Sequence, residues 1–87
     1  MRYTGTPQPE PSGAGAYMCV VDCVNVRNTP SLSGDIVANY AYGEQVNLNG
    51  NFIKADGWTW GEYLGYSGNL RYTAVCSDTG AINWQKC

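Results

Sequence analysis

The stretch DGWTWGEYLGYSGNLRYTAV, residues 56–75, decides the fold of this chain. Residues 58–64 alternate aromatic and smaller side chains, as a pleated strand does. The turn-forming residues at 65–69 follow, and a second strand is expected at 70–76. The stretch therefore predicts an antiparallel hairpin rich in Trp and Tyr.

Shorter segments on both sides of this hairpin also have strand character. We expect them at residues 24–27, 36–40 and 45–49, with residues 52–54 resuming the third strand after a turn, and a sixth strand at 81–84. Turn chemistry separates them, and the Asn-Gly pair at 49–50 is the strongest two-residue turn signal. No helical period persists over a useful window. The pattern predicts an all-β chain folded as a small barrel of five to six short antiparallel strands.

The N-terminal residues have a different composition. Residues 1–16 contain all but one of the four prolines and end in a Ser-Gly-Ala-Gly-Ala run. This composition is typical of a linker or of an arm docked on a domain. We therefore divide the chain into this segment, residues 1–16, and a folded domain, residues 17–87.

Charge is sparse and slightly negative. The net charge is −2, and the five basic residues are scattered along the chain. Nucleic-acid binding depends on Lys and Arg that neutralise phosphates, so we expect no nucleic-acid partner. No apolar run approaches the length of about 18 residues that a membrane-spanning helix needs, and no membrane partner is expected. The start of the chain lacks the layout of a signal peptide, so any export signal would belong to a longer parent or have been removed.

The four cysteines are Cys19, Cys23, Cys76 and Cys87. Their spacing does not match a zinc site, and the chain has no His, so we expect no metal. Small secreted domains often rely on disulfides, which favours bridges here. Cys19 and Cys23 lie about 13 Å apart in an extended chain, too far to join each other. We therefore expect bridges from the N-terminal to the C-terminal part, unless release by lysis leaves four thiols.

Catalytic chemistry is poorly represented. Without His, the usual general base and triad partner is missing. Most of the acids lie in turns beside Gly, and Glu62 is the one acid in the middle of an aromatic strand. We predict no catalytic residue, no cofactor and no enzymatic activity.

Aromatic side chains outnumber what a small core holds. A barrel of this size encloses roughly three or four large rings, and surface Trp and Tyr commonly form ligand platforms. Core packing is the simpler interpretation for Trp60 and Tyr63. For Tyr72 and Trp84, a core position and a surface position are both open.

Two sequence patterns, the second of which has two parts, resemble those of bacterial SH3-type (SH3b) domains. Residues 24–31, VNVRNTPS, resemble the Asn-Val-Arg-x-x-Pro-Ser opening of these domains. Residues 56–63 and 66–75 are similar to their Asp-Gly-x-x-Trp-x-x-Tyr and Ser-Gly-x-x-x-Tyr-x-x-Val patterns. The second pattern marks the subgroup attached to lysostaphin-like endopeptidases and phage endolysins. The resemblance covers about residues 20–84 and implies an SH3-like barrel.

The resemblance also implies a function and a site. Such domains are non-catalytic modules that target a parent cell-wall hydrolase, an endolysin or a bacteriocin, to the peptide cross-bridge of Gram-positive peptidoglycan. Carried over by position, the ligand groove is lined by Asn25, Arg27, Asn51, Ile53, Tyr72 and Trp84. In relatives a docked N-terminal segment contributes as well, and Tyr3-Thr4-Gly5-Thr6 is a weak counterpart.

The implied partners are a cross-bridge peptide and a catalytic domain in the same polypeptide. We expect a monomer that is secreted or released by lysis and is then bound to the bacterial cell wall. Glycine-binding relatives have an acid near Asn51, which this sequence lacks locally, so the bridge can contain Gly, Ala, Ser or Asp. The alternatives are a secreted SH3-like module that binds an extended protein peptide and a small glycan-binding or hydrolytic domain that uses Glu62.

Overall fold

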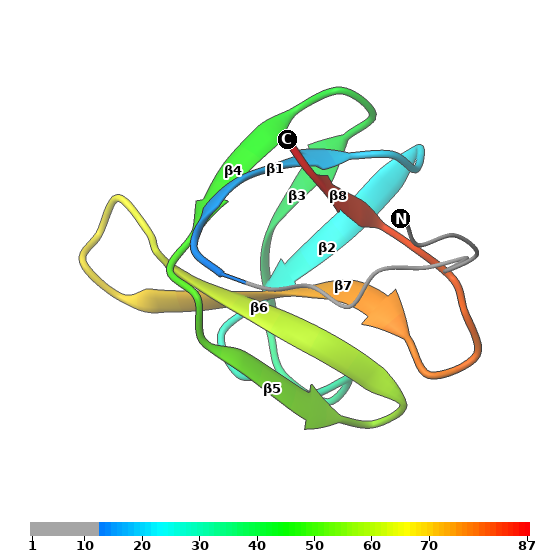
Figure 1. Cartoon of the computed structure of the whole chain (residues 1–87). Coiled ribbons are helices and arrows are strands. Elements are labelled where there is room, and N and C mark those ends of the chain that lie inside the picture. Colours follow the sequence, from blue (N-terminus) through cyan, green and yellow to red (C-terminus); the bar gives the residue numbers. More distant parts are fainter. Residues whose placement is uncertain (1–12) are drawn as a thin grey trace.

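The computed structural model describes residues 13–87, which form eight β-strands and no helix (Figure 1). Their bounds are β1 Gly15–Cys19, β2 Cys23–Arg27, β3 Ile36–Ala41, β4 Gln45–Leu48, β5 Phe52–Ala55, β6 Trp58–Leu64, β7 Leu70–Ser77 and β8 Trp84–Lys86. None of the described residues belongs to a helix that could cross a membrane.

The strands form two antiparallel sheets. The smaller sheet has the order β4-β1-β8 and lies above β5, β6 and β7 in Figure 1. The larger sheet has the order β3-β2-β7-β6-β5. The expected all-β, SH3-like barrel is confirmed.

The strand number exceeds the expected five to six because β1 was not expected and because residues 52–55 form a separate strand, β5, in the larger sheet, whereas β4 belongs to the smaller one. Sequence reasoning missed β1, whose five residues begin inside the Gly/Ala-rich segment assigned to the linker and carry no strong strand signal. The last strand begins at Trp84, rather than spanning 81–84, because its partner is β1. Ile82 forms only an isolated bridge to Cys76. The paired residues of β1 and β8 lie more than sixty positions apart in the sequence, and local patterns do not reveal such a pairing.

The hairpin that the sequence predicted is present as β6 and β7, and β5 precedes it through a two-residue turn. Asp56 and Gly57 both have positive φ, 55° and 82°, which is the backbone of a type I′ turn. Gly61 in β6 has no side chain because the small sheet approaches it closely. A Cβ there would lie 2.6 Å from Leu48 Cδ1 and 3.0 Å from Val75 Cγ2.

The core lies between the two sheets. Val24 and Val26 point into it from β2, and Thr73 and Val75 from β7, while the residues between them face outward. Tyr17, Leu48 and Trp84 contribute large side chains from the chain segments of the smaller sheet. The opposite face of the larger sheet carries the candidate site, and Trp60, which lies on that face, is itself 1% exposed.

The expected disulfides are not present. All four cysteines lie within residues 13–87, and none is joined to another. Cys87 donates its backbone N–H to Ala16 O, at 3.0 Å, and so lies three residues along β1 from Cys19. That offset corresponds to about 10 Å along a strand, beyond the Cα separation of about 7 Å that a disulfide spans. The prediction of bridges between the two ends of the domain is wrong for this structure.

Candidate binding site

A row of side chains crosses four neighbouring strands on the outward face of the larger sheet. Arg27 in β2 is paired with Tyr72 in β7, and Tyr72 is paired with Glu62 in β6. Glu62 N in turn donates to Asn51 O, at 3.3 Å, just before β5. Residues directly opposite each other in antiparallel strands project to the same face. The row thus brings together Arg27, Tyr72 and Asn51, which are far apart in the sequence.

A second row lies beside the first. Ile53 is paired with Trp60, and Trp60 with Ala74. Asn25 is exposed, two residues before Arg27 in β2, and so shares its face. Five of the six residues expected to line the groove therefore lie on one face of one sheet.

Trp84 is the exception and requires a correction. Its side chain is 2% exposed and belongs to the core between the sheets. Its ring packs edge-on against Tyr40 with centroids 5.3 Å apart, and Nε1 donates to Thr73 Oγ1 at 2.9 Å. Pairing of β8 with β1 turns this residue inward, so Trp84 does not line the outward face.

A loop closes one end of the outward face. Residues 28–35 follow β2, and two hydrogen bonds connect this loop to Asp56 and Arg27. Leu32 N donates to the Asp56 carboxylate at 2.9 Å, and Arg27 donates through its guanidinium to Gly34 O at 2.8 Å. Beneath this loop lies a shallow groove of about 180 Å³. Its lining includes Asn25, Arg27, Leu32, Trp58 and Trp60.

Glu62 is the most highly coordinated polar side chain of this face. Its Oε1 accepts from Asn49 Nδ2 and Asn51 Nδ2, both at 2.9 Å, and its Oε2 accepts from the Tyr72 hydroxyl at 2.7 Å. The residue Glu62 is 8% exposed. The hydrogen bonds from Asn51, Asn49 and Tyr72 hold the pKa of Glu62 below its ordinary value, against the opposing effect of burial.

The sequence did not predict Glu62 as part of the binding site. Glu62 is an acid within an aromatic strand, and no acid lies close to Asn51 along the chain. The pairing of β5 with β6 places the Glu62 carboxylate within hydrogen-bond distance of the Asn51 amide. The acid near Asn51 therefore comes from the neighbouring strand, and only the strand register reveals it.

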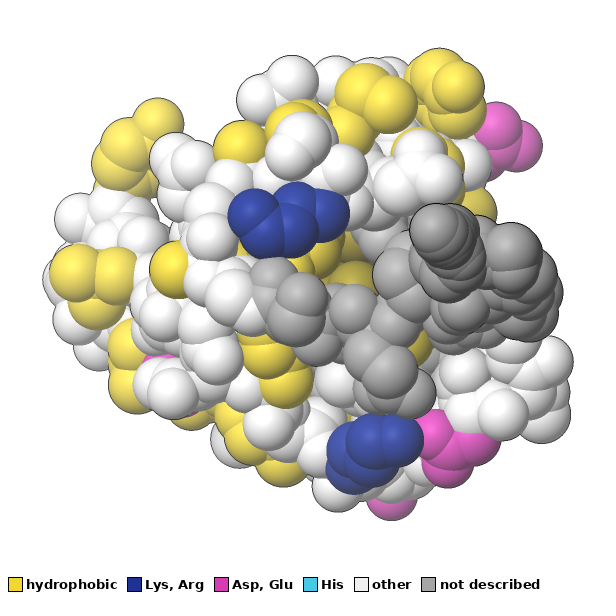
Figure 2. Space-filling model, viewed as in Figure 1, with side chains coloured by type: hydrophobic (Ala, Val, Ile, Leu, Met, Phe, Trp, Pro, Cys, Tyr) yellow, Lys and Arg dark blue, Asp and Glu magenta, His cyan; other side chains and the backbone are white. Residues whose placement is uncertain are grey.

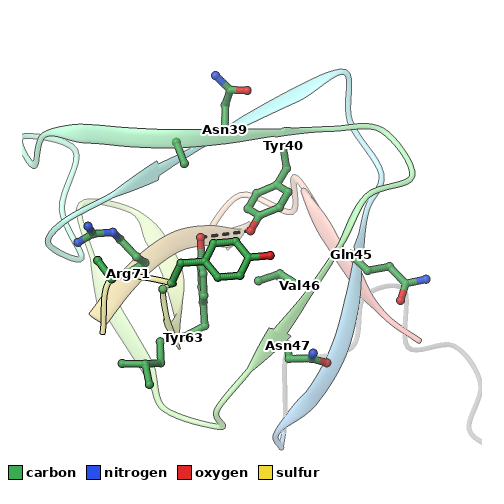
Figure 3. A pocket seen from close by; sticks show the side chains of 12 residues that line it. Asn39, Tyr40, Gln45, Val46, Asn47, Tyr63 and Arg71 are labelled. Carbon is green, nitrogen blue, oxygen red and sulfur yellow. Dashed lines mark hydrogen bonds between the residues drawn. The ribbon is translucent and has the colours of Figure 1, made fainter. Parts of the chain in front are cut away.

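A larger cavity of about 560 Å³ opens where β4 and β3 face the β6–β7 hairpin (Figure 3). Tyr40 and Tyr63 meet there, with their hydroxyl oxygens 3.3 Å apart, and burial raises the pKa of Tyr63. Asn39 and Gln45 are labelled on its rim and point away from its centre (Figure 3). None of the six residues expected to bind a ligand lines this cavity.

Charged side chains are sparse on the surface that the described residues form. In the view of Figure 2, Lys and Arg lie in separate places rather than in one patch, and acidic groups lie at the margins. Within residues 13–87, no cluster of three or more Cys, Asp or Glu side chains could hold a metal ion. The segment Tyr3–Thr6, expected to contribute to the groove, lies outside the described residues.

Comparison with solved structures identifies the fold. The chain is similar to Ly7917, with a TM-score of 0.73 and 29% identity over 88% of this chain and 34% of Ly7917. It is similar to the lysostaphin SH3b domain in its P4-G5 complex, with a TM-score of 0.69 and 22% identity over 84% and 81% of the two chains. The cell wall binding domain of the Staphylococcal phage 2638A endolysin has a TM-score of 0.70 and 15% identity over 84% and 83%.

No protein-family model and no curated protein matches the chain. The structural matches nevertheless define its class, a small SH3-like β-barrel. Within that class the chain has the fold of bacterial SH3b domains, as its motifs indicated. It spans about a third of the length of Ly7917.

Proposed function

We propose that this chain is a non-catalytic module that binds peptidoglycan and targets a hydrolase of the same polypeptide to Gram-positive cell walls. The observation that carries the proposal is the shared face of Asn25, Arg27, Asn51, Ile53 and Tyr72, residues inferred separately from motif positions. The SH3b fold of lysostaphin and phage-endolysin cell-wall-binding domains supports it.

The dimensions of the face suit a short peptide. The row crosses the neighbouring strands β2, β7 and β6 and ends just before β5, with one residue from each: Arg27, Tyr72, Glu62 and Asn51. Neighbouring strands lie about 4.8 Å apart, so the row measures about 14 Å. An extended peptide of about four residues has this length. We therefore propose the peptide cross-bridge as the ligand.

The chemistry of Glu62 supports a binding role rather than catalysis. A general acid at neutral pH needs a raised pKa, whereas three donated hydrogen bonds lower the pKa of this carboxyl. The described residues contain no His to act as its partner. The proposed module therefore binds the wall, and the hydrolysis belongs to the proposed parent catalytic domain.

Binding to purified Gram-positive cell walls tests the proposal. Asn25→Ala removes an exposed side chain and keeps the backbone carbonyl that accepts from Thr73 Oγ1. Loss of one or two ligand hydrogen bonds should weaken wall binding about fivefold to tenfold at unchanged stability. The matched control is Tyr66→Ala, which removes a fully exposed ring from the other cavity and should leave binding unchanged.

Two results would contradict the proposal. Absence of wall binding by the unaltered chain would remove the targeting function. Equal binding by the unaltered chain and Asn25→Ala, with a loss in Tyr66→Ala, would move the site to the cavity of Figure 3.

A further inference from the structure

The Glu62 network fixes which hydrogen-bonding atoms its neighbours present to a ligand. An ionised carboxylate accepts hydrogen bonds and donates none. Each of its three partners must therefore turn a donor toward it: the Nδ2 groups of Asn49 and Asn51 and the hydroxyl of Tyr72. The backbone bonds Asn49 N to Glu62 O, at 2.9 Å, and Glu62 N to Asn51 O hold the same residues in register.

The network consequently turns two acceptor atoms outward, Oδ1 of Asn51 and the phenol oxygen of Tyr72, and leaves the second Nδ2 hydrogen of Asn51 beside them. With Asn51 Nδ2 directed at Glu62, the Oδ1 of the same planar amide points away from the carboxylate. Tyr72 has one O–H, which it donates to Glu62, so its phenol oxygen offers only lone pairs to a ligand. Asn49 Oδ1 already accepts from Asn51 N at 3.0 Å and is internally satisfied.

The protonation states of the network agree with this arrangement. The donated hydrogen bonds lower the pKa of Glu62, and the bond to Glu62 raises the pKa of Tyr72. At neutral pH the carboxyl is ionised and the phenol keeps its proton. The orientation of donors and acceptors is therefore constant over the neutral range.

We propose that Glu62 is a positioning residue that makes Asn51 and Tyr72 hydrogen-bond acceptors, so that this end of the site binds N–H groups of a peptide. The inference rests on the proposed function and specifies its ligand chemistry: backbone N–H groups of the peptide lie over Asn51 and Tyr72. The guanidinium of Arg27 lies at the opposite end of the row and can only donate, so a ligand carbonyl or carboxylate belongs there. The row therefore has acceptors at one end and a donor at the other, and it should bind a peptide in one orientation.

An amide-to-ester comparison tests this proposal. The probes are triglycine and trialanine, each with a matched analogue in which ester oxygens replace the backbone amide N–H groups. These analogues keep the carbonyl acceptors and lose the donors. The unaltered chain should bind an amide probe about fivefold to tenfold more tightly than its ester analogue, the value of about one hydrogen bond.

Glu62→Gln should remove most of this discrimination, to within about twofold. A Gln amide has donors of its own, which allow Asn51 or Tyr72 to reverse its direction. The matched control is Glu44→Gln, because Glu44 is exposed and its carboxylate accepts from the backbone N–H of Ala41. Glu44→Gln should keep the full amide preference. Tyr72→Phe retains the ring and lacks the acceptor, so it should also reduce the amide preference. This variant keeps the proposal testable even where Glu62→Gln does not fold.

The outcomes separate this inference from the proposed function. Equal binding of amide and ester by the unaltered chain overturns the inference, and so does an undiminished preference in folded Glu62→Gln. Wall binding without binding of either peptide overturns it as well and leaves the targeting function intact. Failure of the unaltered chain to bind walls overturns the proposed function itself.

Discussion

Replacement of Trp84 by Ala distinguishes a core residue from a ligand platform. The side chain is 2% exposed, packs on Tyr40 and donates to Thr73 Oγ1. Removing a buried Trp side chain costs about 3–5 kcal/mol, because apolar contacts are lost and a cavity remains. A domain of this size is stable by about 5–10 kcal/mol, so Trp84→Ala should consume a large part of that stability.

The assay is urea and thermal unfolding, followed by circular dichroism, alongside wall binding at a temperature where the variant is folded. The melting temperature should fall by at least about 12 °C, since 1 kcal/mol corresponds to about 4–8 °C in small domains. Trp84→Phe retains a ring against Tyr40 and should lose less stability. The folded fraction of both variants should bind walls as the unaltered chain does.

One result would refute this reasoning. If Trp84→Ala unfolds at the same urea concentration as the unaltered chain but no longer binds walls, Trp84 contacts the ligand. The placement of β8 beside β1, with Trp84 inward, would then be incorrect.

Three further perturbations address packing, charge and thiol chemistry. Gly61→Ala forces a Cβ against the buried Leu48 side chain and should destabilise the fold by about 1–3 kcal/mol, measured by urea unfolding; an unchanged midpoint would contradict the close approach of the sheets. Because the pKa of Glu62 is lower in the folded protein than its ordinary value of 4.5, ionised Glu62 stabilises the fold at pH values above 4.5, and this stabilisation is lost as the pH falls through the folded pKa. On acidification, the urea midpoint of the unaltered chain should therefore drop by more than that of Glu62→Gln. Equal drops in the two proteins would contradict this origin. Thiol reagents should label the exposed Cys23 and Cys87 in the native protein and all four cysteines only after unfolding; two labelled thiols in the unfolded, non-reduced protein would reveal a disulfide.

The sequence by itself determined the class of fold. Alternating side chains and turn residues define β2 to β7 closely, because both are properties of short segments. The turn at Asp56-Gly57 has the positive φ values that such a pair favours. The motif positions of Asn25, Arg27 and Tyr72 identified three residues that share the outward face.

Only the tertiary structure decided which residues meet across strands. Trp84 is buried because β8 pairs with β1, and no local pattern encodes a contact between opposite ends of the domain. Cys19 and Cys87 are offset by three residues in the same pairing of strands, which places them too far apart for a disulfide. The carboxylate beside Asn51 comes from Glu62, eleven positions away, because β6 is antiparallel to β5. Strand pairing sets such contacts through distances and directions in space, whereas the sequence records only the order along one chain.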